Sequence, residues 1–400
     1  TALHRLTHRA RPVPLALALP ASWTALEWAL GHLPFGWAFP WAPLGLGLAR
    51  WPGTIGIAEL IGVGGVTAWL AAVSGMTGQA AAAWADRGWG RGRRGALLLA
   101  GAVLLALAPI GWSRARLRTL PVRAVGRVAA VALAVPPRAP AAARAEMGVA
   151  QTENALAALT DPGVALVVLP EMTLPLDPAA PAGEPFRARL AAAAASLGAP
   201  LLVGVLGVAG GQEYNSALLL GGGGTDGAPA FRADKRRLVP GVERVSAVHA
   251  PWLAPSRAGY DPGEGWPVAR FGGMGVGALV CYEVAFAQDA RLLVAGGADV
   301  LAVVTSDAWF GEGALRRAGI AQQTAHLTMR VLETRTGAVR ASNGGPALVI
   351  APTGRVVAAA DAGAVVGPVG AVERPTLFVR TGDLAGPAAA VVLLALLLVE

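Results

Sequence analysis

The sequence predicts transmembrane helices followed by a layered α/β domain, with one further apolar helix closing the chain. Apolar types make up 54% of the 400 residues and charged types only 14%, whereas an ordinary soluble domain carries about 25% charge. Residues 1–120 contain 11 arginines and three acidic residues, a balance of +8 that equals the formal charge of the whole chain. This basic excess in the most apolar third is typical of a membrane protein with basic loops and disfavours a nucleic-acid-binding protein.

Four apolar runs predict membrane-spanning helices, which we place in a transmembrane region over residues 1–115 and a C-terminal span over residues 383–400. The runs are Pro12–Leu30, Gly53–Ala85, Gly95–Trp112 and Leu384–Val399. The last two are short for the roughly 20 residues that a crossing needs. The first also has the layout of a signal peptide, but the spans that follow favour a transmembrane helix.

Aromatic and basic residues predict how these spans are oriented. The segment Leu33–Trp51 is rich in Trp, Phe and Pro and is typical of an interfacial loop. Four arginines (Arg87, Arg91, Arg93 and Arg94) lie between the second and third spans and predict a cytoplasmic loop there. The domain after the third span would then lie on the opposite side. Further arginines beyond that span oppose this orientation, but large domains cross a membrane largely regardless of charge.

Residues 116–382 are predicted to form the α/β domain, because short β-rich runs alternate with Ala-rich helical stretches. Candidate strands are Arg127–Ala134, Val164–Leu169, Pro200–Val208, Asn215–Leu220, Val276–Cys281, Val300–Thr305, Ala347–Ile350 and Arg355–Ala358. Candidate helices are Ala141–Leu159, Glu184–Leu197, Asp289–Ala295 and Leu315–Thr334.

Two residue types occur once each in the chain. Cys281 is the only cysteine, which excludes a disulfide framework and a structural zinc site built on cysteines. Lys235 is the only lysine, because the other 32 basic residues are arginines. Arginine is a rigid planar fork and lysine a compact donor on a flexible stem. A single lysine in such a chain indicates a position where a guanidinium does not serve.

Three reactive side chains stand at the ends of candidate strands. Glu171 and Cys281 follow apolar runs, and Lys235 opens another segment. Ligands gather at the carboxyl ends of strands in layered sheets. Each residue alone also fits an ordinary structural position, but together they supply a thiol nucleophile, a carboxylate for proton transfer and an ammonium for the oxyanion. We expect no metal ion or organic cofactor, because the thiol carries the covalent chemistry.

Four motifs in order resemble the nitrilase, or carbon–nitrogen hydrolase, superfamily, and within it the apolipoprotein N-acyltransferase family. They are Leu169-Pro170-Glu171, Lys235-x-x-Leu238-Val239-Pro240-x-x-Glu243, Cys281-Tyr282-Glu283 and Ser306-Asp307-Ala308-Trp309-Phe310-Gly311. The resemblance implies a nitrilase-like α-β-β-α sandwich whose Glu-Lys-Cys triad is Glu171, Lys235 and Cys281. Members of that family have more N-terminal helices, which leads us to expect that this chain is truncated at its start.

The resemblance implies a two-step acyl transfer in the bacterial inner membrane. Cys281 would take an acyl chain from a phospholipid, forming a thioester that the N-terminal amine of a diacylglyceryl-modified apolipoprotein then attacks. Glu171 would act as general base and then acid, and Lys235 with the backbone N–H of Tyr282 would hold the oxyanion. The protein would cross the membrane several times, with its catalytic domain on the extracytoplasmic side.

Further residues are implied in supporting roles. Glu243 and Glu283 would support Lys235 and the leaving group, although Glu283 also fits a role that only positions the lysine. The long loop Gly241–Gly265 is interpreted as a lid over the acyl chain. The expected substrate-binding residues are Trp252, Tyr260 and Trp309.

Two other functions are compatible with the same sequence. A membrane-tethered amidase acting on a small amide would share the triad but release the acyl group to water. A catalytically inactive membrane scaffold would need neither thiol nor lysine. The flanking spans disfavour the amidase, since a soluble substrate needs no bilayer, and the retained Lys235 and Cys281 disfavour the scaffold.

Overall fold

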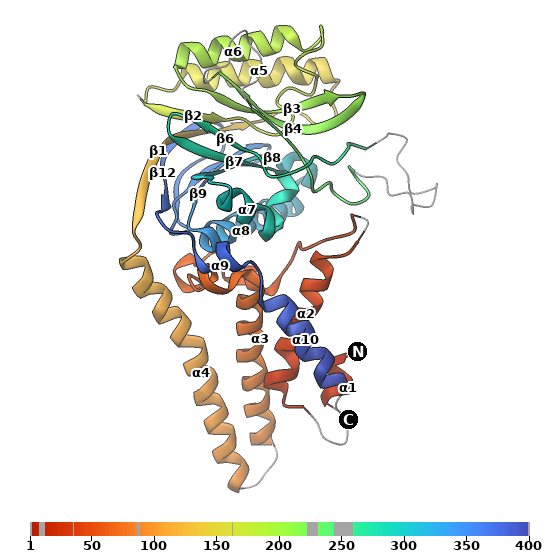
Figure 1. Cartoon of the computed structure of the whole chain (residues 1–400), viewed down its shortest axis with the longest axis vertical. Coiled ribbons are helices and arrows are strands. Elements are labelled where there is room, and N and C mark those ends of the chain that lie inside the picture. The colour runs from red at the N-terminus through yellow and green to blue at the C-terminus, as the bar shows by residue number, and fades with distance from the viewer. Residues whose placement is uncertain are drawn as a thin grey trace. The chain divides into compact units, whose positions relative to one another are not determined.

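The computed structural model describes residues 2–7, 13–34, 36–85, 89–161, 163–221, 231–243 and 259–398. The chain divides into two units, of which one combines residues 1–120 with 376–400 and the other comprises residues 121–375. The first unit contains helices from both ends of the chain, and the second contains the α/β fold (Figure 1).

Within its described residues, the first unit contains helices and connecting loops but no strand. Its helices are α1 (Ala2–Thr7), α2 (Leu15–Gly31), α3 (Ala58–Ala85), α4 (Trp89–Arg118), α9 (Leu377–Thr381) and α10 (Ala385–Leu398), with short 3₁₀ helices η1 (Leu44–Leu48) and η2 (Pro52–Thr54). Among the described residues, two helices are long and apolar enough to cross a membrane, Ala58–Ala85 and Gly92–Arg118. The first and fourth expected spans form shorter helices, α2 with 17 residues and α10 with 14.

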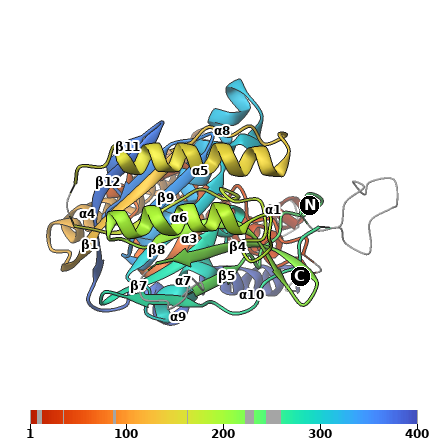
Figure 2. The ribbon, with the colours of Figure 1, turned by 90° about the horizontal axis from the view of Figure 1, so that it is seen from above.

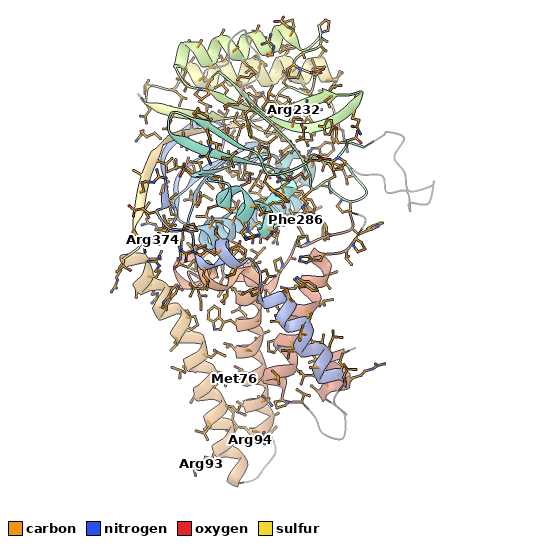
Figure 3. All side chains as sticks on the ribbon, in the orientation of Figure 1. Met76, Arg93, Arg94, Arg232, Phe286 and Arg374 are labelled. Carbon is orange, nitrogen blue, oxygen red and sulfur yellow. The ribbon has the colours of Figure 1, made fainter. Side chains whose placement is uncertain are left out.

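Helices α3 and α4 pack as a pair whose polar contacts lie inside an otherwise apolar region (Figure 1). The buried Glu59 carboxylate of α3 accepts a hydrogen bond from Arg116 Nε of α4 at 2.7 Å. Trp69 Nε1 donates to the Leu105 carbonyl, also at 2.7 Å. Gly62 interrupts α3 with φ of 64°, a conformation in which glycine has no steric penalty. In Figure 3, Arg93 and Arg94 mark the N-terminal part of α4.

The second unit contains twelve strands that hydrogen-bond into one sheet, in which nine strands follow a single path and three pair beside it. They are β1 (Val122–Leu133), β2 (Val164–Val168), β3 (Leu201–Ala209), β4 (Gln212–Leu220), β5 (Phe231–Asp234), β6 (Val268–Phe271), β7 (Met274–Val280), β8 (Val300–Ser306), β9 (Gly337–Asn343), β10 (Ala347–Ile350), β11 (Val356–Ala360) and β12 (Gly363–Val372). The order β5-β4-β3-β2-β1 continues to β9-β8-β7-β6, while β12 pairs with β1, and β10 pairs with β9 and β11. Only two residue pairs, at Ala132 and Leu133, join β1 to β9.

The sheet folds over at this narrow junction into two layers that share one apolar core. Alternate residues of β1 show the arrangement, because Val128 and Ala130 face strands of the other layer while Ala129 and Val131 face helices. Helices α5 (Ala141–Ala157) and α6 (Glu184–Leu197) lie side by side on the first layer (Figures 1 and 2). Helices α7 (Ala287–Ala295) and α8 (Gly313–Thr334) cover the second. The expected α-β-β-α sandwich is thus confirmed.

All eight candidate strands and all four candidate helices of the α/β domain are present, most with boundaries shifted by a few residues. Sequence patterns missed β5, β6, β9 and β12. Of the expected interfacial loop Leu33–Trp51, the described residues contain the short helix η1 and little other regular structure. Phe35 lies outside the described residues.

Candidate active site

Glu171 stands where β2 ends, at the edge of the first sheet layer. The apolar run Val167–Leu169 buries the strand, and Pro170 ends it because it cannot donate to the ladder. The Glu171 side chain is only 5% exposed, and its backbone N–H donates to the Thr305 carbonyl on β8 at 3.3 Å. Glu171 therefore lies where the first layer meets β8 of the second.

Lys235 follows β5 in the same layer and is 1% exposed. Its Nζ donates to Glu243 Oε1 at 2.7 Å and to Glu171 Oε1 at 3.3 Å. Burial alone would lower the pKa of Lys235, but the charges of Glu243, Glu171 and the Cys281 thiolate together raise that pKa well above its usual range. The amine is therefore protonated at neutral pH.

Asn215 on β4 connects the two carboxylates, and sequence reasoning missed it. Its side-chain Nδ2 donates to Glu171 Oε1 at 2.7 Å and to Glu243 Oε1 at 3.1 Å. Its backbone carbonyl accepts a hydrogen bond from the Lys235 backbone N–H at 2.8 Å. One short polar side chain thus holds both acids against the lysine. Among the described residues, the second carboxylate oxygen of Glu171 and the amide oxygen of Asn215 are buried without a hydrogen-bond partner.

Cys281 begins the 3₁₀ helix η4 (Cys281–Ala285), directly after β7 of the second layer. Its φ of 50° lies in the left-handed region, which non-glycine residues rarely adopt and which is characteristic of functional sites. The sharp turn places a partly buried thiol at the edge of the sheet. Burial raises the pKa of this thiol to about 12, with a further rise from Glu171, against a lowering by Lys235.

Two more polar side chains lie at the sulfur of Cys281, and neither stood out in the sequence. Gln323 Nε2 on α8 is 3.5 Å from Sγ, and Thr305 Oγ1 at the end of β8 donates to Gln323 Oε1 at 3.2 Å. Thr305 can instead turn its single hydroxyl proton toward the sulfur, which lowers the pKa of the thiol. The sulfur therefore has charged groups from the first layer and neutral groups from the second.

Glu283 is fully buried and does not contact the Lys235 amine through any hydrogen bond in the described residues. Its two oxygens accept from the backbone N–H groups of Arg236 and Val280, both at 2.8 Å. Burial raises the pKa of Glu283. The carboxylate joins the residue after Lys235 to the residue before Cys281, which fits the positioning role.

The segment after Lys235 is further anchored by two arginine–aromatic contacts. The guanidinium of Arg236 stacks over Trp266, and that of Arg237 stacks over Phe286, which is labelled in Figure 3. Arg237 also donates to the buried Asp289 at 3.2 Å. These contacts hold the segment after Lys235 against Trp266, Phe286 and α7.

The expected substrate-binding residues differ in how far they are exposed, and one of them lies outside the described residues. Trp309 lies on a 3₁₀ turn with its side chain 66% exposed. Tyr260 is half-buried, and its pKa is raised by burial first and then by the charges of Glu243 and Glu171. Trp252 lies outside the described residues, as does most of the expected lid. The Tyr282 ring is buried edge-on against Phe286 at 5.2 Å.

These contacts provide a thiol, a general base and a permanent cation within one buried network. The ammonium has three N–H donors, of which two reach the carboxylates, and the third is available for an oxygen that gains charge. Within the described ranges, no group of three or more His, Cys, Asp or Glu residues is arranged to hold a metal ion. The arrangement therefore suits covalent catalysis at a carbonyl carbon.

The sequence matches two family models. The carbon–nitrogen hydrolase model covers residues 127–366, more than half of the chain. The model of the apolipoprotein N-acyltransferase N-terminal domain covers residues 1–76. The two matches fall in the α/β unit and the helical unit respectively.

Several curated proteins resemble the chain over most of its length. A protein from Methylococcus capsulatus named apolipoprotein N-acyltransferase is 34% identical over 86% of this chain and 65% of its own length. One from Allorhizobium ampelinum with the same name is 29% identical over 85% of this chain and 63% of its own. The chain therefore spans slightly less than two thirds of these relatives. Among solved structures, an amidase from Nesterenkonia sp. matches with a TM-score of 0.46 and 21% identity, covering 64% of this chain and 93% of the amidase.

Proposed function

The chain belongs to the carbon–nitrogen hydrolase family, and within it to the apolipoprotein N-acyltransferases, and on this premise we propose that it moves a fatty acyl chain from a phospholipid to an apolipoprotein. The acceptor is the N-terminal amine of a protein that already carries a diacylglyceryl group. The protein acts in the bacterial inner membrane, which it crosses several times, with the α/β unit on the extracytoplasmic side. The observation that carries the proposal is the buried network of Glu171, Lys235 and Glu243 beside the only cysteine of the chain.

The first step forms an acyl-enzyme. Glu171 takes the thiol proton of Cys281 as the sulfur attacks the ester carbonyl carbon of the phospholipid. The third N–H of Lys235 and the backbone N–H of Tyr282 donate to the oxygen that becomes negative. Glu171 returns the proton to the departing glycerol oxygen, so that a lysophospholipid leaves and a thioester remains on the sulfur.

The second step transfers the acyl group to nitrogen. The neutral amine of the acceptor attacks the thioester carbon, and Glu171 takes the proton that this nitrogen loses. The same donors hold the oxyanion until the carbon–sulfur bond breaks. The sulfur then recovers its proton from Glu171, and the amide product leaves a resting thiol behind.

The electrostatics of the site support proton transfer during the attack rather than a thiolate at rest. Because the pKa of Cys281 is raised to about 12, the thiol is protonated at neutral pH. Lys235 is held protonated by Glu243 and Glu171. Asn215 holds Oε1 of Glu171 by a hydrogen bond of 2.7 Å, which limits the rotation of the proposed base.

Acyl-enzyme formation from a labelled phospholipid tests this function. The full chain in phospholipid–detergent micelles should acquire label from a phospholipid with radioactive acyl chains. The label should be released by neutral hydroxylamine, which cleaves thioesters. Because Cys281 is the only cysteine, the Cys281→Ala variant should carry no hydroxylamine-sensitive label. Addition of a diacylglyceryl-cysteinyl peptide should move the label to its N-terminus as an amide.

The other two candidate functions give different outcomes in the same assay. Release of free fatty acid without transfer to the peptide, together with turnover of small amides, would indicate a membrane-tethered amidase. A folded protein that acquires no label and turns over no amide would indicate a scaffold. Either outcome would refute the acyltransferase proposal.

A further inference from the structure

The sulfur of Cys281 is contacted by a neutral amide from the second sheet layer. Gln323 lies on α8 with 2% of its surface exposed, and its Nε2 approaches Sγ to 3.5 Å, a normal separation for a donor to sulfur. The helix α8 packs on β8 and η4 through apolar residues such as Leu327 and Val331. The glutamine is therefore held at the sulfur by the body of the domain.

Thr305 determines which end of this amide faces the sulfur. Its hydroxyl donates to Gln323 Oε1 at 3.2 Å, and Thr305 itself is fully buried at the end of β8. A glutamine amide has an acceptor oxygen at one end and two N–H donors at the other. With the oxygen occupied by a donated hydrogen bond, the N–H end is directed at Cys281.

A donor at this position has a chemical use because a thiolate only accepts hydrogen bonds. Donors favour the charged form of the group they contact, whereas burial disfavours it. Two N–H groups of the Lys235 ammonium are already used by Glu171 and Glu243. The Gln323 amide is the donor from the opposite layer, and it carries no charge that would compete with proton transfer to Glu171.

We propose that Gln323 is a catalytic residue that donates a hydrogen bond to the Cys281 sulfur as its negative charge develops, and that Thr305 positions the amide. The inference rests on the proposed role of Cys281 as nucleophile. The thiol proton passes to Glu171, the freed electron pair forms the carbon–sulfur bond, and the amide gives up no proton. Once the thioester has formed, the sulfur is neutral and the hydrogen bond weakens. Its contribution is therefore largest in the transition state.

Alkylation of the single thiol tests this role without requiring acyltransferase activity. The full chain in detergent is treated with iodoacetamide at a fixed pH between 8 and 9, below the pKa of the thiol, where the rate follows the thiolate fraction. Gln323→Met keeps the length of the side chain and removes the donor. We expect the pKa of Cys281 to rise by about one unit, the low end for a hydrogen bond to a charged group.

The expected change in rate is smaller than the change in thiolate fraction. A thiolate of higher pKa is more nucleophilic, with a Brønsted coefficient of about 0.4–0.5. A rise of about one unit should therefore slow alkylation about three- to fourfold. Gln323→Glu should slow it further, because a carboxylate beside the sulfur repels the thiolate. Gln322→Met, one residue earlier on α8, is the matched control and should react at the wild-type rate.

Four results would overturn the proposal or part of it. Equal alkylation rates in Gln323→Met and wild type, with unchanged thermal unfolding, would mean that the amide only fills space. Faster alkylation in Gln323→Met would mean that the amide oxygen faces the sulfur and stabilises the thiol. A Thr305→Val variant that unfolds normally should slow alkylation as well, and the double variant with Gln323→Met should be no slower than Gln323→Met alone. Wild-type reactivity in Thr305→Val, or an additive loss in the double variant, would remove Thr305 from the positioning role. A loss of acyl transfer with unchanged alkylation would contradict Gln323 as a thiolate donor and leave the acyltransferase proposal intact.

Discussion

Replacement of Lys235 by arginine keeps the charge of the site and changes only its shape. The lysine is 1% exposed and fits between Glu243 at 2.7 Å and Glu171 at 3.3 Å. A guanidinium is a planar fork that extends beyond the position of Nζ. In a fully buried cage it must displace a carboxylate, the thiol or the backbone around Asn215.

The magnitude follows from these contacts. Because the cation is retained, the carboxylates are not left unpaired, so the cost in unfolding free energy should be limited to the overpacking of about 1–3 kcal/mol. Activity should fall much further. Loss of one oxyanion donor costs about 10²–10³-fold, and displacement of a catalytic group by about 1 Å costs about 10²-fold. We therefore expect acyl-enzyme formation to slow by at least about 10²-fold.

The measurement is the single-turnover rate of label transfer from phospholipid to Cys281, with thermal unfolding as the test of folding. Lys235→Met should lose as much activity but also about 3–5 kcal/mol of unfolding free energy, since it leaves buried carboxylates without their cation. The reciprocal change Arg123→Lys on β1 is the control, because that side chain is 46% exposed and pairs with Asp299 instead of with a group of the site. If Lys235→Arg kept more than about a tenth of the wild-type rate, the single lysine would have no special role and the oxyanion assignment would fail.

Three further variants or conditions test the network around this lysine. Asn215→Leu removes the hydrogen bonds to Glu171 and Glu243 and should slow acyl-enzyme formation about 10- to 100-fold in the same single-turnover assay. Gly204→Ala would bring a Cβ to 2.5 Å from the Glu171 Cα atom, and should lower both the rate of acyl-enzyme formation and the unfolding temperature. A normal rate would show that the Glu171 segment can shift without harm to the reaction. The raised pKa of Cys281 predicts that iodoacetamide reacts with the folded protein at a rate that still increases with pH above 9. A plateau of the alkylation rate at about pH 8.5 in the folded protein would contradict the burial argument. The same shift affects stability, because the folded thiol keeps its proton while the unfolded thiol loses it at about pH 8.5. The free energy of unfolding should therefore decline as pH rises from about 8.5 toward 12.

The strands that the sequence predicted are those with continuous apolar β-formers, and the missed strands lack that signal. β9 (Gly337–Asn343) carries Arg340, which was not expected inside a sheet but is fully buried and pairs with Asp307 at 2.6 Å. β12 (Gly363–Val372) contains Pro368 and several glycines, which are depleted in strands. Both strands form because tertiary pairing outweighs local preference.

The candidate site divides in a similar way. Glu171, Lys235 and Cys281 could be singled out because rarity and strand-end position mark them in the sequence. Asn215 could not, because a single amide inside an apolar strand resembles any satisfied core residue. Gln323 follows another glutamine on a helix, and only the arrival of β7 and β8 beneath α8 shows which of the two meets the sulfur.

The rate of the reaction should depend on how the two sheet layers are aligned with each other. Base and cation come from the first layer, and the sulfur with its amide donor comes from the second. The strand pairing that joins β1 to β9 involves only two residue pairs. Side-chain packing in the shared core therefore sets the distance over which the proton travels. Truncation of Val339 or Val168 to alanine, both buried in that core, would leave every reacting group of the site unchanged. It would still let one layer shift against the other. The turnover rate should therefore respond to small changes in the packing of the core.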